Sequence, residues 1–385
     1  MPKFLKWTLS NQMRSRKLYT YLLPIILLTA IFSILGLRDS ISDEHPINIS
    51  MNEKHRGVCW VGGPRLVDST MLEALATRNV NWISQTPFGW QRGYSNPEIG
   101  NNIGNDRAWW GERDEGLKVT TQLARERGIK TILKPHIWLR DNEGKWRGDI
   151  AMNSEEDWQK WFADYEEFIL HYAKLAEAEK MEMLCIGTEL HKTCIEREQN
   201  WRSLIAKIRN VYSGKLTYAA NFSEEFEDVA FWDELDYIGV QAYFPVAETE
   251  NPTLEEVRQG WQPHLEKLEA FSRQHEKPIL FTEAGYKSTK DSGVEPWVWP
   301  QRLSQEEVLD IYSEETQATL YEAMFREVFD KPFIAGIHLW KWYPSQRRRS
   351  NNSSDRQQRL YNIDFTPQGK KAEEVMTEWF TKFSQ

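Results

Sequence analysis

Short apolar segments alternate with long amphipathic segments from about residue 55 to the end of the 385-residue chain. This alternation is typical of repeated βα units, in which a helix follows each strand of a parallel sheet. Eight strands are predicted, at residues 57–62, 79–87, 128–139, 181–190, 215–222, 235–245, 277–286 and 334–342.

Four long helices are predicted among these strands, at residues 154–180, 251–277, 304–330 and 366–383. Ser154 and Asp157 have capping-box spacing at the start of the first helix. Eight strands alternating with helices over about 330 residues predict an α/β fold, a (β/α)₈ TIM barrel. An open doubly wound sheet is the alternative, but the turn WVGGPRL after the first strand lacks the GxGxxG pattern that such sheets usually carry.

The amino-terminal residues have the pattern of a membrane anchor. Residues 1–17 form a basic tail, and residues 18–37 form an uncharged apolar run of about the length that crosses a bilayer. Positive charge before this run predicts a cytoplasmic amino terminus and an exported remainder. A cleaved signal peptide is the alternative. After a polar linker at 38–54, the catalytic domain is expected at 55–385, anchored to the membrane on its periplasmic or extracellular side.

Composition narrows the classes of partner. The formal net charge of −9 gives no general attraction to nucleic acid, and the basic tract at 347–359 is interpreted as a solvated loop. Cys59, Cys185 and Cys194 lack the spacing of a disulfide framework or a zinc ribbon, although a Cys185–Cys194 pair stays open. The 18 Trp, 14 Tyr and 17 Phe either fill the core or offer flat faces to sugar rings.

Two glutamates stand out at the carboxyl ends of the predicted strands, where such barrels carry their working residues. Glu189 ends the fourth strand and Glu283 the seventh, nearly across the barrel from each other. Two carboxylates facing one pocket suit glycoside hydrolysis, in which one protonates the leaving oxygen and the other attacks the anomeric carbon or activates water. Singly, each glutamate could instead form an ion pair or cap a helix. The other candidates at strand ends are Lys134, His136, Asn221, Tyr243, Trp90, Trp340 and Trp342.

Histidines at strand ends suggest a second kind of site. His136, His191 and His338 could contribute to a hydrolytic zinc centre, which needs three or four converging ligands. The sequence contains no HExxH motif and no HxH on its first strand. It also lacks the GxSxG elbow of acyl transfer and the phosphate-binding P-loop.

Several of these segments together resemble glycoside hydrolase family 113, whose characterised members are mostly β-1,4-mannanases. The two glutamates match the hallmark of the wider clan of retaining barrel glycosidases to which that family belongs. The resemblance runs through most of the predicted exported domain, in the segments ILKPHIWL, KWRGDIAMNSEEDWQKWFADYEEFILHYAKLAE, LCIGTEL, YAANF, LDYIGVQAYFP, ILFTEAGY and IDFTPQGKKAEEV.

The resemblance implies a role for each matching position. Glu189 corresponds to the acid/base of the family and Glu283 to its nucleophile. Tyr243 resembles the tyrosine that hydrogen-bonds the nucleophile, and Trp340 resembles the platform under the sugar being cleaved. Polar contacts with the substrate are expected from Asn221, His136 and Lys134.

One position departs from the wider clan. Many members have Asn directly before the acid/base, where it contacts the sugar 2-hydroxyl, and Thr188 stands there in this chain, as it does in family 113. Asn221 is our candidate for that contact. In the loop 287–302, Trp297 and Trp299 either form a subsite or lid, or pack on a neighbouring helix.

These features predict a retaining glycoside hydrolase that needs no metal or other cofactor, with carboxyl groups about 5–5.5 Å apart. The expected substrate is a β-1,4-linked polysaccharide or oligosaccharide, with β-mannan foremost. The alternatives are a catalytically silent carbohydrate-binding protein of the envelope and a metal-dependent barrel hydrolase.

Overall fold

A computed structural model describes residues 46–141, 144–299, 304–344 and 362–385. The predicted membrane anchor at 18–37 and the basic tract at 347–359 lie outside these residues. Within the described ranges, no helix combines the length and the apolar character needed to cross a membrane.

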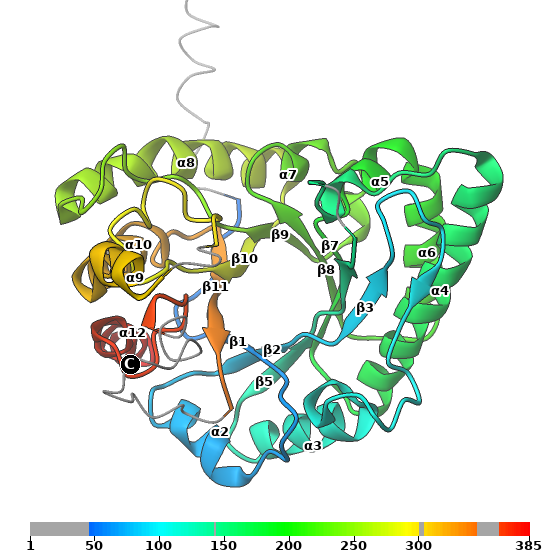
Figure 1. Ribbon diagram of the computed structural model, residues 1–385, viewed down its shortest axis with the longest axis horizontal. Helices are drawn as coiled ribbons and strands as arrows, with labels where there is room; N and C mark the ends of the chain where they lie inside the picture. Colours follow the sequence, from blue (N-terminus) through cyan, green and yellow to red (C-terminus); the bar gives the residue numbers. More distant parts are fainter. Residues whose placement is uncertain (1–45, 142–143, 300–303, 345–361) are drawn as a thin grey trace, which may run out of the picture. The chain divides into compact units, whose positions relative to one another are not determined.

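Eight parallel strands close into a barrel, which confirms the predicted (β/α)₈ fold. Around the barrel they follow the order β1-β11-β10-β9-β8-β7-β5-β2, so the last strand pairs with the first. Figure 1 shows the strands as an inner ring with helices around it. The strands are β1 (His55–Trp60), β2 (Trp82–Gln85), β5 (Lys130–Leu133), β7 (Met183–Thr188), β8 (Lys215–Asn221), β9 (Tyr237–Gln241), β10 (Ile279–Ala284) and β11 (Ile334–Trp342).

Helices connect the strands and cover the outside of the barrel. The long ones match the predicted amphipathic segments, and the connection between β8 and β9 holds only short helices, as expected. The α-helices are α2 (Ser69–Ala76), α3 (Asp114–Arg125), α4 (Glu155–Ala178), α5 (His191–Glu196), α6 (Glu198–Arg209), α7 (Glu225–Asp228), α8 (Leu254–His275), α9 (Gln305–Ile311), α10 (Glu314–Val328) and α12 (Lys371–Lys382). Short 3₁₀ helices are η1 (Trp110–Glu112), η2 (Arg147–Asp149) and η3 (Trp232–Glu234).

The side chains of each barrel strand alternate between two separate buried layers, because successive residues of a strand point to opposite faces. On β7, Met183 and Cys185 belong to the cluster inside the barrel, whereas Leu184 and Ile186 belong to the larger cluster between strands and helices. The inner cluster consists of Trp82, Ile132, Met183, Cys185, Ala219, Leu280 and Ala335. The barrel interior is therefore a packed core, and it holds the residues at the carboxyl ends of the strands in fixed positions.

Helix α4 illustrates how the sequence specifies the outer layer. The Ser154 hydroxyl accepts a hydrogen bond from the Asp157 backbone N–H at 3.1 Å, which confirms the predicted cap and typically stabilises a helix by about 1 kcal/mol. Large apolar side chains then recur every three or four residues, so they form one buried stripe. The stripe contains Trp158, Trp161, Phe162, Tyr165, Phe168, Ile169 and Tyr172.

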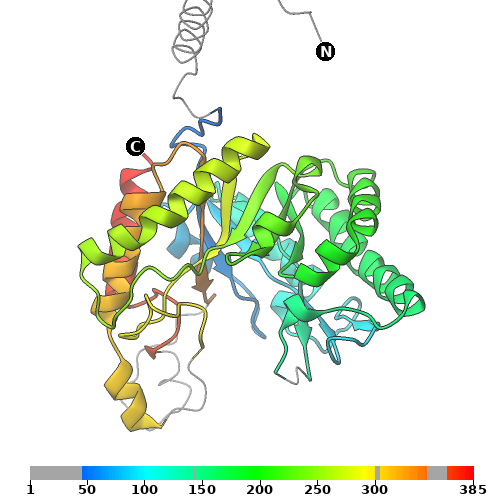
Figure 2. The ribbon, with the colours of Figure 1, turned by 90° about the horizontal axis from the view of Figure 1, so that it is seen from above.

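The third predicted strand, at 128–139, is two strands. Its second half is β6 (His136–Leu139), which leaves the barrel and pairs with β3 (Phe88–Gln91), itself paired with β4 (Ile99–Gly100). We call these three strands the accessory sheet. Pro135 separates the two halves, and a proline cannot donate a hydrogen bond to a strand ladder. Figure 2 shows the accessory sheet, in cyan, at the same end of the barrel as helix α9.

The predicted helix at 304–330 also divides in two. The backbone is extended at Tyr312, and Ser313 begins a new helix by accepting a hydrogen bond from the Thr316 N–H at 3.1 Å. Two caps nine residues apart, at Ser304 and Ser313, therefore produce α9 and α10.

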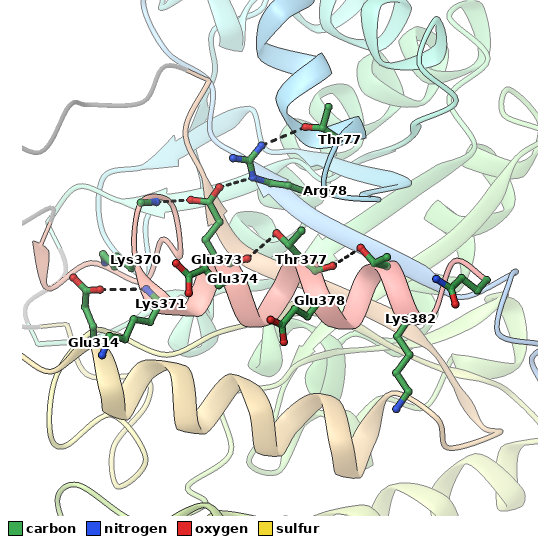
Figure 3. A pocket seen from close by; sticks show the side chains of 13 residues that line it. Thr77, Arg78, Glu314, Lys370, Lys371, Glu373, Glu374, Thr377, Glu378 and Lys382 are labelled. Carbon is green, nitrogen blue, oxygen red and sulfur yellow. Dashed lines mark hydrogen bonds and ion pairs between the residues drawn. The ribbon is translucent and has the colours of Figure 1, made fainter.

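Hydrogen bonds between charged side chains and backbone groups link α12 to the turn after α2 and to the start of α10 (Figure 3). Glu373 receives hydrogen bonds from the Arg78 guanidinium and from the Gly369 N–H, and Glu314 accepts from the Lys371 N–H at 3.2 Å. A hollow of about 1110 Å³ lies over these groups. None of the predicted site residues lines this hollow. Arg78 and Glu373, which do line it, form an ion pair with each other, so we assign the hollow a structural role.

Candidate active site

A second hollow, of about 980 Å³, brings most of the predicted residues together. Its walls come from the carboxyl ends of barrel strands and from segments that follow them, where the fold places its functional groups. We call it the rim cavity. It is lined by Trp138, Trp146, Arg147, Glu189, Asn221, Phe222, Ser223, Tyr243, Glu283, Trp297, Trp299, Trp340, Lys341 and Phe365.

Glu189 follows β7 with a left-handed backbone, φ 52°, and its side chain enters the rim cavity while only 8% of the residue is exposed. The Asn221 amide donates to its Oε1 at 2.8 Å, and the Arg147 Nε lies 3.6 Å from its Oε2. Burial raises the pKa of Glu189, and the charge of Glu283 adds to this, whereas Arg147 and Asn221 partly oppose it. The site therefore favours the protonated form of Glu189, which can donate a proton.

Glu283 is held by two donors. The register of β10 against β9 shifts between Phe281 and Glu283, and such irregularities re-aim a side chain. Lys134 Nζ lies 2.5 Å from Oε1 and the Tyr243 hydroxyl 2.9 Å from Oε2. Both carboxylate oxygens thus accept a hydrogen bond, and one of these bonds comes from a cation, which makes it a strong one.

The Glu283 carboxylate in turn raises the pKa values of its two donors, Lys134 and Tyr243. Lys134 is fully buried, and burial is the largest single influence and lowers its pKa; the pKa is nevertheless raised, because the charge and hydrogen bond of Glu283 and the nearby Cys59 and Cys185 together outweigh it. Burial and the adjacent Glu283 charge raise the pKa of Tyr243 well above its ordinary value, so the phenol keeps the proton that it donates.

His136 is uncharged, and a hydrogen bond fixes which of its ring nitrogens carries the proton. Burial, followed by the charges of Lys134 and Arg147, lowers its pKa well below the ordinary value. Arg147 Nη1 lies 3.2 Å from Nδ1, and because a guanidinium only donates, Nδ1 must accept and Nε2 must carry the proton. That Nε2 lies 3.7 Å from Glu283 Oε1, and the imidazole stacks on Trp340 at a ring separation of 6.4 Å.

A buried carboxyl group stands behind Glu189. Glu225, at the start of α7, accepts from the Asn221 N–H at 2.7 Å and from the Tyr218 hydroxyl at 2.5 Å. The same Tyr218 oxygen accepts from the Leu190 N–H at 2.6 Å. Through Tyr218, Glu225 fixes the backbone at Leu190, next to Glu189. It also fixes the backbone of Asn221, whose side chain donates to Glu189. Burial raises the pKa of Glu225 to about 8.

Two predicted aromatic contacts lie outside the rim cavity. Trp342 is only 2% exposed and packs in the core, with the Arg78 guanidinium 5.6 Å from its ring. Trp90 lies on the accessory sheet and lines a neighbouring hollow. By contrast, Trp297 and Trp299 both line the rim cavity, so the loop that carries them forms part of its wall.

The three candidate zinc-ligand histidines do not converge. His191 contacts Asp228 at 2.8 Å, and His338 lies inside the barrel between His55 and Ser84, whereas His136 lies beside Glu283, 3.7 Å from its Oε1. In the part of the chain that the structure describes, no group of three His, Cys, Asp or Glu could hold a metal ion. Cys59, Cys185 and Cys194 are buried free thiols, so the Cys185–Cys194 pair that was left open does not form.

Sequence reasoning missed Arg147 and Glu225 as parts of the site. Arg147 lies in the 3₁₀ turn η2, thirteen residues after Lys134, where no strand end marks it. Glu225 has the appearance of an ordinary acidic residue in the first turn of a short helix. The segment KWRGD, which carries Arg147, was a signal, because it belongs to the matched family segments.

Comparison with known proteins agrees with this geometry. Residues 67–370 match the family model described as Glycoside Hydrolase Family 113. Among solved structures, the GH113 β-mannanase AaManA from Alicyclobacillus acidocaldarius, in complex with ManMIm, shares 28% identity, with a TM-score of 0.70 over 86% of this chain and 98% of that chain. A complex structure of a GH113 β-1,4-mannanase shares 25% identity, with a TM-score of 0.69 over 85% of this chain and 99% of that chain.

The remaining comparisons show either similarity of fold alone or no match. The β-glucuronidase from Ruminococcus gnavus, 14% identical with a TM-score of 0.54 over 86% of this chain and 50% of that chain, shares the fold alone. A search among curated proteins gave no match. The family match covers most of the chain, and therefore this protein belongs to glycoside hydrolase family 113.

Proposed function

We propose that this glycoside hydrolase cleaves β-1,4-linked mannan with net retention, using Glu283 as nucleophile and Glu189 as acid/base. One observation carries the proposal: two buried carboxyl groups share an aromatic-lined cavity, where burial raises the pKa of Glu189 and Glu283 accepts hydrogen bonds from Lys134 and Tyr243. A carboxyl group that can give a proton, beside a carboxylate that can attack, is the arrangement that glycoside hydrolysis requires.

In the first step, the ionised Glu283 attacks the anomeric carbon while Glu189 gives its proton to the departing glycosidic oxygen. The bond from carbon to that oxygen breaks, and a glycosyl ester forms on Glu283. Tyr243 and Lys134 hold the attacking carboxylate in place before the reaction. The indole of Trp340 offers a flat face in the same cavity.

In the second step, Glu189 removes a proton from water, which attacks the ester and releases the sugar. The change of role follows from the surroundings of Glu189. Once Glu283 is esterified, its charge no longer raises the pKa of Glu189, whereas Arg147 and Asn221 still lower it. The pKa of Glu189 is therefore lower in the intermediate, where it must act as a base.

The proposed substrate rests on family membership and on similarity to three GH113 mannanase structures at 25–28% identity. The eight aromatic side chains among the lining residues suit a chain of sugar rings rather than a small polar molecule.

A polysaccharide panel tests the proposal. The wild type should release reducing ends from β-1,4-mannan faster than from β-1,4-glucan or β-1,4-xylan. Glu283→Gln should abolish hydrolysis, whereas Glu227→Gln, which alters an exposed carboxylate paired with Lys267, should not. Hydrolysis that survives in Glu283→Gln would contradict the mechanism, and binding without hydrolysis by the wild type would favour a silent carbohydrate-binding protein.

We also propose that the enzyme is anchored in the membrane with its catalytic domain outside the cytoplasm. The basic residues at 1–17 followed by the apolar run at 18–37 support this proposal. Protease added to intact cells, or to spheroplasts where an outer membrane is present, should degrade the catalytic domain, and the full-length chain should sediment with membranes. Full protection of the domain, or a chain shortened by signal cleavage, would contradict an uncleaved anchor.

A further inference from the structure

Glu189 has a backbone conformation that few residues with a side chain adopt. Its φ of 52° lies in the left-handed region, which costs free energy for a residue other than glycine and persists only where surrounding contacts hold it. The Glu189 N–H donates to the Ala219 carbonyl oxygen at 2.9 Å. The next N–H, that of Leu190, donates to the Tyr218 hydroxyl at 2.6 Å. These two hydrogen bonds hold the turn that directs Glu189 into the rim cavity.

Glu225 joins two separate supports of Glu189. Its Oε1 accepts a hydrogen bond from the Tyr218 hydroxyl, the group that holds the Leu190 N–H. Its Oε2 accepts from the Asn221 N–H at 2.7 Å, and the Asn221 side chain donates to Glu189 Oε1 at 2.8 Å. One carboxyl group is thus connected both to the backbone beside Glu189 and to its side chain.

The orientation of the Asn221 amide is fixed as well. Asn221 Oδ1 accepts hydrogen bonds from the Ser223 N–H at 3.0 Å and from the Ser223 hydroxyl at 2.9 Å. Because the oxygen of the amide is engaged in this way, the Nδ2 group is the one that faces Glu189. The support on the side chain of Glu189 is therefore directional.

Helix α7, which carries Glu225, is tied to the segment that follows Glu189. Asp228 on α7 contacts His191 at 2.8 Å, and His191 begins α5 two residues after Glu189. The helix that carries Glu225 and the turn that carries Glu189 are thus joined at a second point, outside the rim cavity.

Glu225 would be a costly residue if it only filled space. It is 1% exposed, and both of its hydrogen-bond partners, the Tyr218 hydroxyl and the Asn221 N–H, are uncharged. Burial of a carboxyl group without a cationic partner costs free energy, and an apolar side chain of similar size would not carry that cost. Buried ionisable groups of this kind are concentrated at functional sites. The place of Glu225 behind Glu189 therefore indicates a role in the reaction.

We propose that Glu225 is a positioning residue for the acid/base, which keeps Glu189 where it can protonate the departing oxygen. Tyr218 transmits its effect to the backbone, and Asn221 transmits it to the side chain. This inference rests on the proposed function, because it requires Glu189 to be the acid/base. The loss of Glu225 should impair proton donation and spare the attack by Glu283, which Lys134 and Tyr243 hold in place.

The test compares two substrates that share a sugar and differ in their leaving group. Phenyl β-mannobioside needs a proton on its departing oxygen, whereas 2,4-dinitrophenyl β-mannobioside releases a stable anion without one. In Glu225→Met, kcat/KM for the phenyl substrate should fall roughly 10- to 100-fold, the cost of a misplaced general acid, and kcat/KM for the dinitrophenyl substrate should change little. Glu225→Gln should recover most of the lost activity, because its amide can accept from Asn221 and donate to Tyr218.

Two further variants accompany this comparison. Tyr218→Phe keeps the aromatic ring and removes only the hydroxyl, so it tests the same connection if Glu225→Met does not fold. It should lower the ratio of kcat/KM for the phenyl over the dinitrophenyl substrate in the same direction. Glu227→Met is the control on the same helix, since its exposed carboxylate pairs with Lys267, and it should leave both substrates unaffected.

Glu189→Gln separates the failure of this inference from the failure of the proposed function. It should lower kcat/KM for the phenyl substrate far more than for the dinitrophenyl substrate. If the wild type cleaves neither substrate, or Glu189→Gln shows no such selectivity, the proposed function falls and this inference falls with it. If Glu189→Gln shows the selectivity, but Glu225→Met and Tyr218→Phe lower both substrates equally or change neither, the inference is overturned while the proposed function stands.

Discussion

Replacing Lys134 by Met should destabilise the protein strongly. The ammonium group lies 2.5 Å from Glu283 Oε1 and 3.0 Å from the Thr282 carbonyl oxygen, and the exposed fractions of the two charged side chains are 0% and 6%. Removing one partner of a buried pair leaves the other charge uncompensated, which typically costs about 3–5 kcal/mol. We expect about 3 kcal/mol, the low end, because Tyr243 still donates to Oε2.

The pH dependence of this contribution follows from the pKa of Lys134. Its pKa in the folded protein is raised above the ordinary value of 10.5, so the stabilising contribution is complete below 10.5 and is lost only as the pH rises through the folded value. The penalty should therefore be constant through the neutral range. Urea unfolding followed by tryptophan fluorescence measures the free energy of unfolding.

A double-mutant cycle assigns the penalty to the buried pair. In a Glu283→Gln background, Lys134→Met should cost about 2 kcal/mol less, because no buried carboxylate is left unpaired. Lys267→Met is the control, since its ion pair with Glu227 is about 40% exposed at both ends, and it should cost at most about 0.5 kcal/mol. Equal penalties for the two lysine variants, or an unchanged penalty in the Glu283→Gln background, would refute the reasoning.

Three further predictions concern the neighbours of the catalytic carboxyl groups. Burial raises the pKa of Glu225 from 4.5 to about 8, so between these two pH values the group is protonated in the folded state and ionised in the unfolded state. The free energy of unfolding therefore falls as the pH rises through this range. Glu225→Gln should reduce this pH dependence, measured by urea unfolding at several pH values. Arg147→Gln removes a charge that lowers the pKa of Glu189, so the alkaline limb of the kcat profile should move to higher pH, and an unmoved limb would contradict the assignment. Tyr243→Phe deletes a hydrogen bond to the charged Glu283, worth about 1.5–3 kcal/mol, and kcat should fall roughly 10- to 100-fold while circular dichroism is unchanged.

The barrel and its two glutamates were predictable because both depend on periodic, local signals. Each barrel strand is a short apolar run, and the helices between strands carry amphipathic stripes and serine caps. Once the strands are counted, Glu189 and Glu283 are placed at one rim by topology alone. The division of residues 128–139 into two strands was missed, because the run has strand-like composition on both sides of Pro135 and contains no longer turn segment.

The surroundings of the glutamates depend on contacts that the sequence does not encode locally. Arg147 and Glu225 reach the site from a 3₁₀ turn and a four-residue helix, and neither has a periodic signal. Trp340 and Trp342 have the same parity on β11, so alternation could not separate the one that lines the cavity from the one that the core covers. Their difference arises from neighbours far along the chain, such as Arg78.

The stereochemistry of the first product tests the central claim most directly. Proton NMR of β-1,4-mannohexaose during the first minutes of hydrolysis distinguishes the anomers before mutarotation mixes them. If Glu283 forms a glycosyl ester that water then opens, two inversions at one carbon should give the β-anomer first. Initial appearance of the α-anomer would mean that water attacks the substrate directly, and the assignment of Glu283 as nucleophile would be wrong.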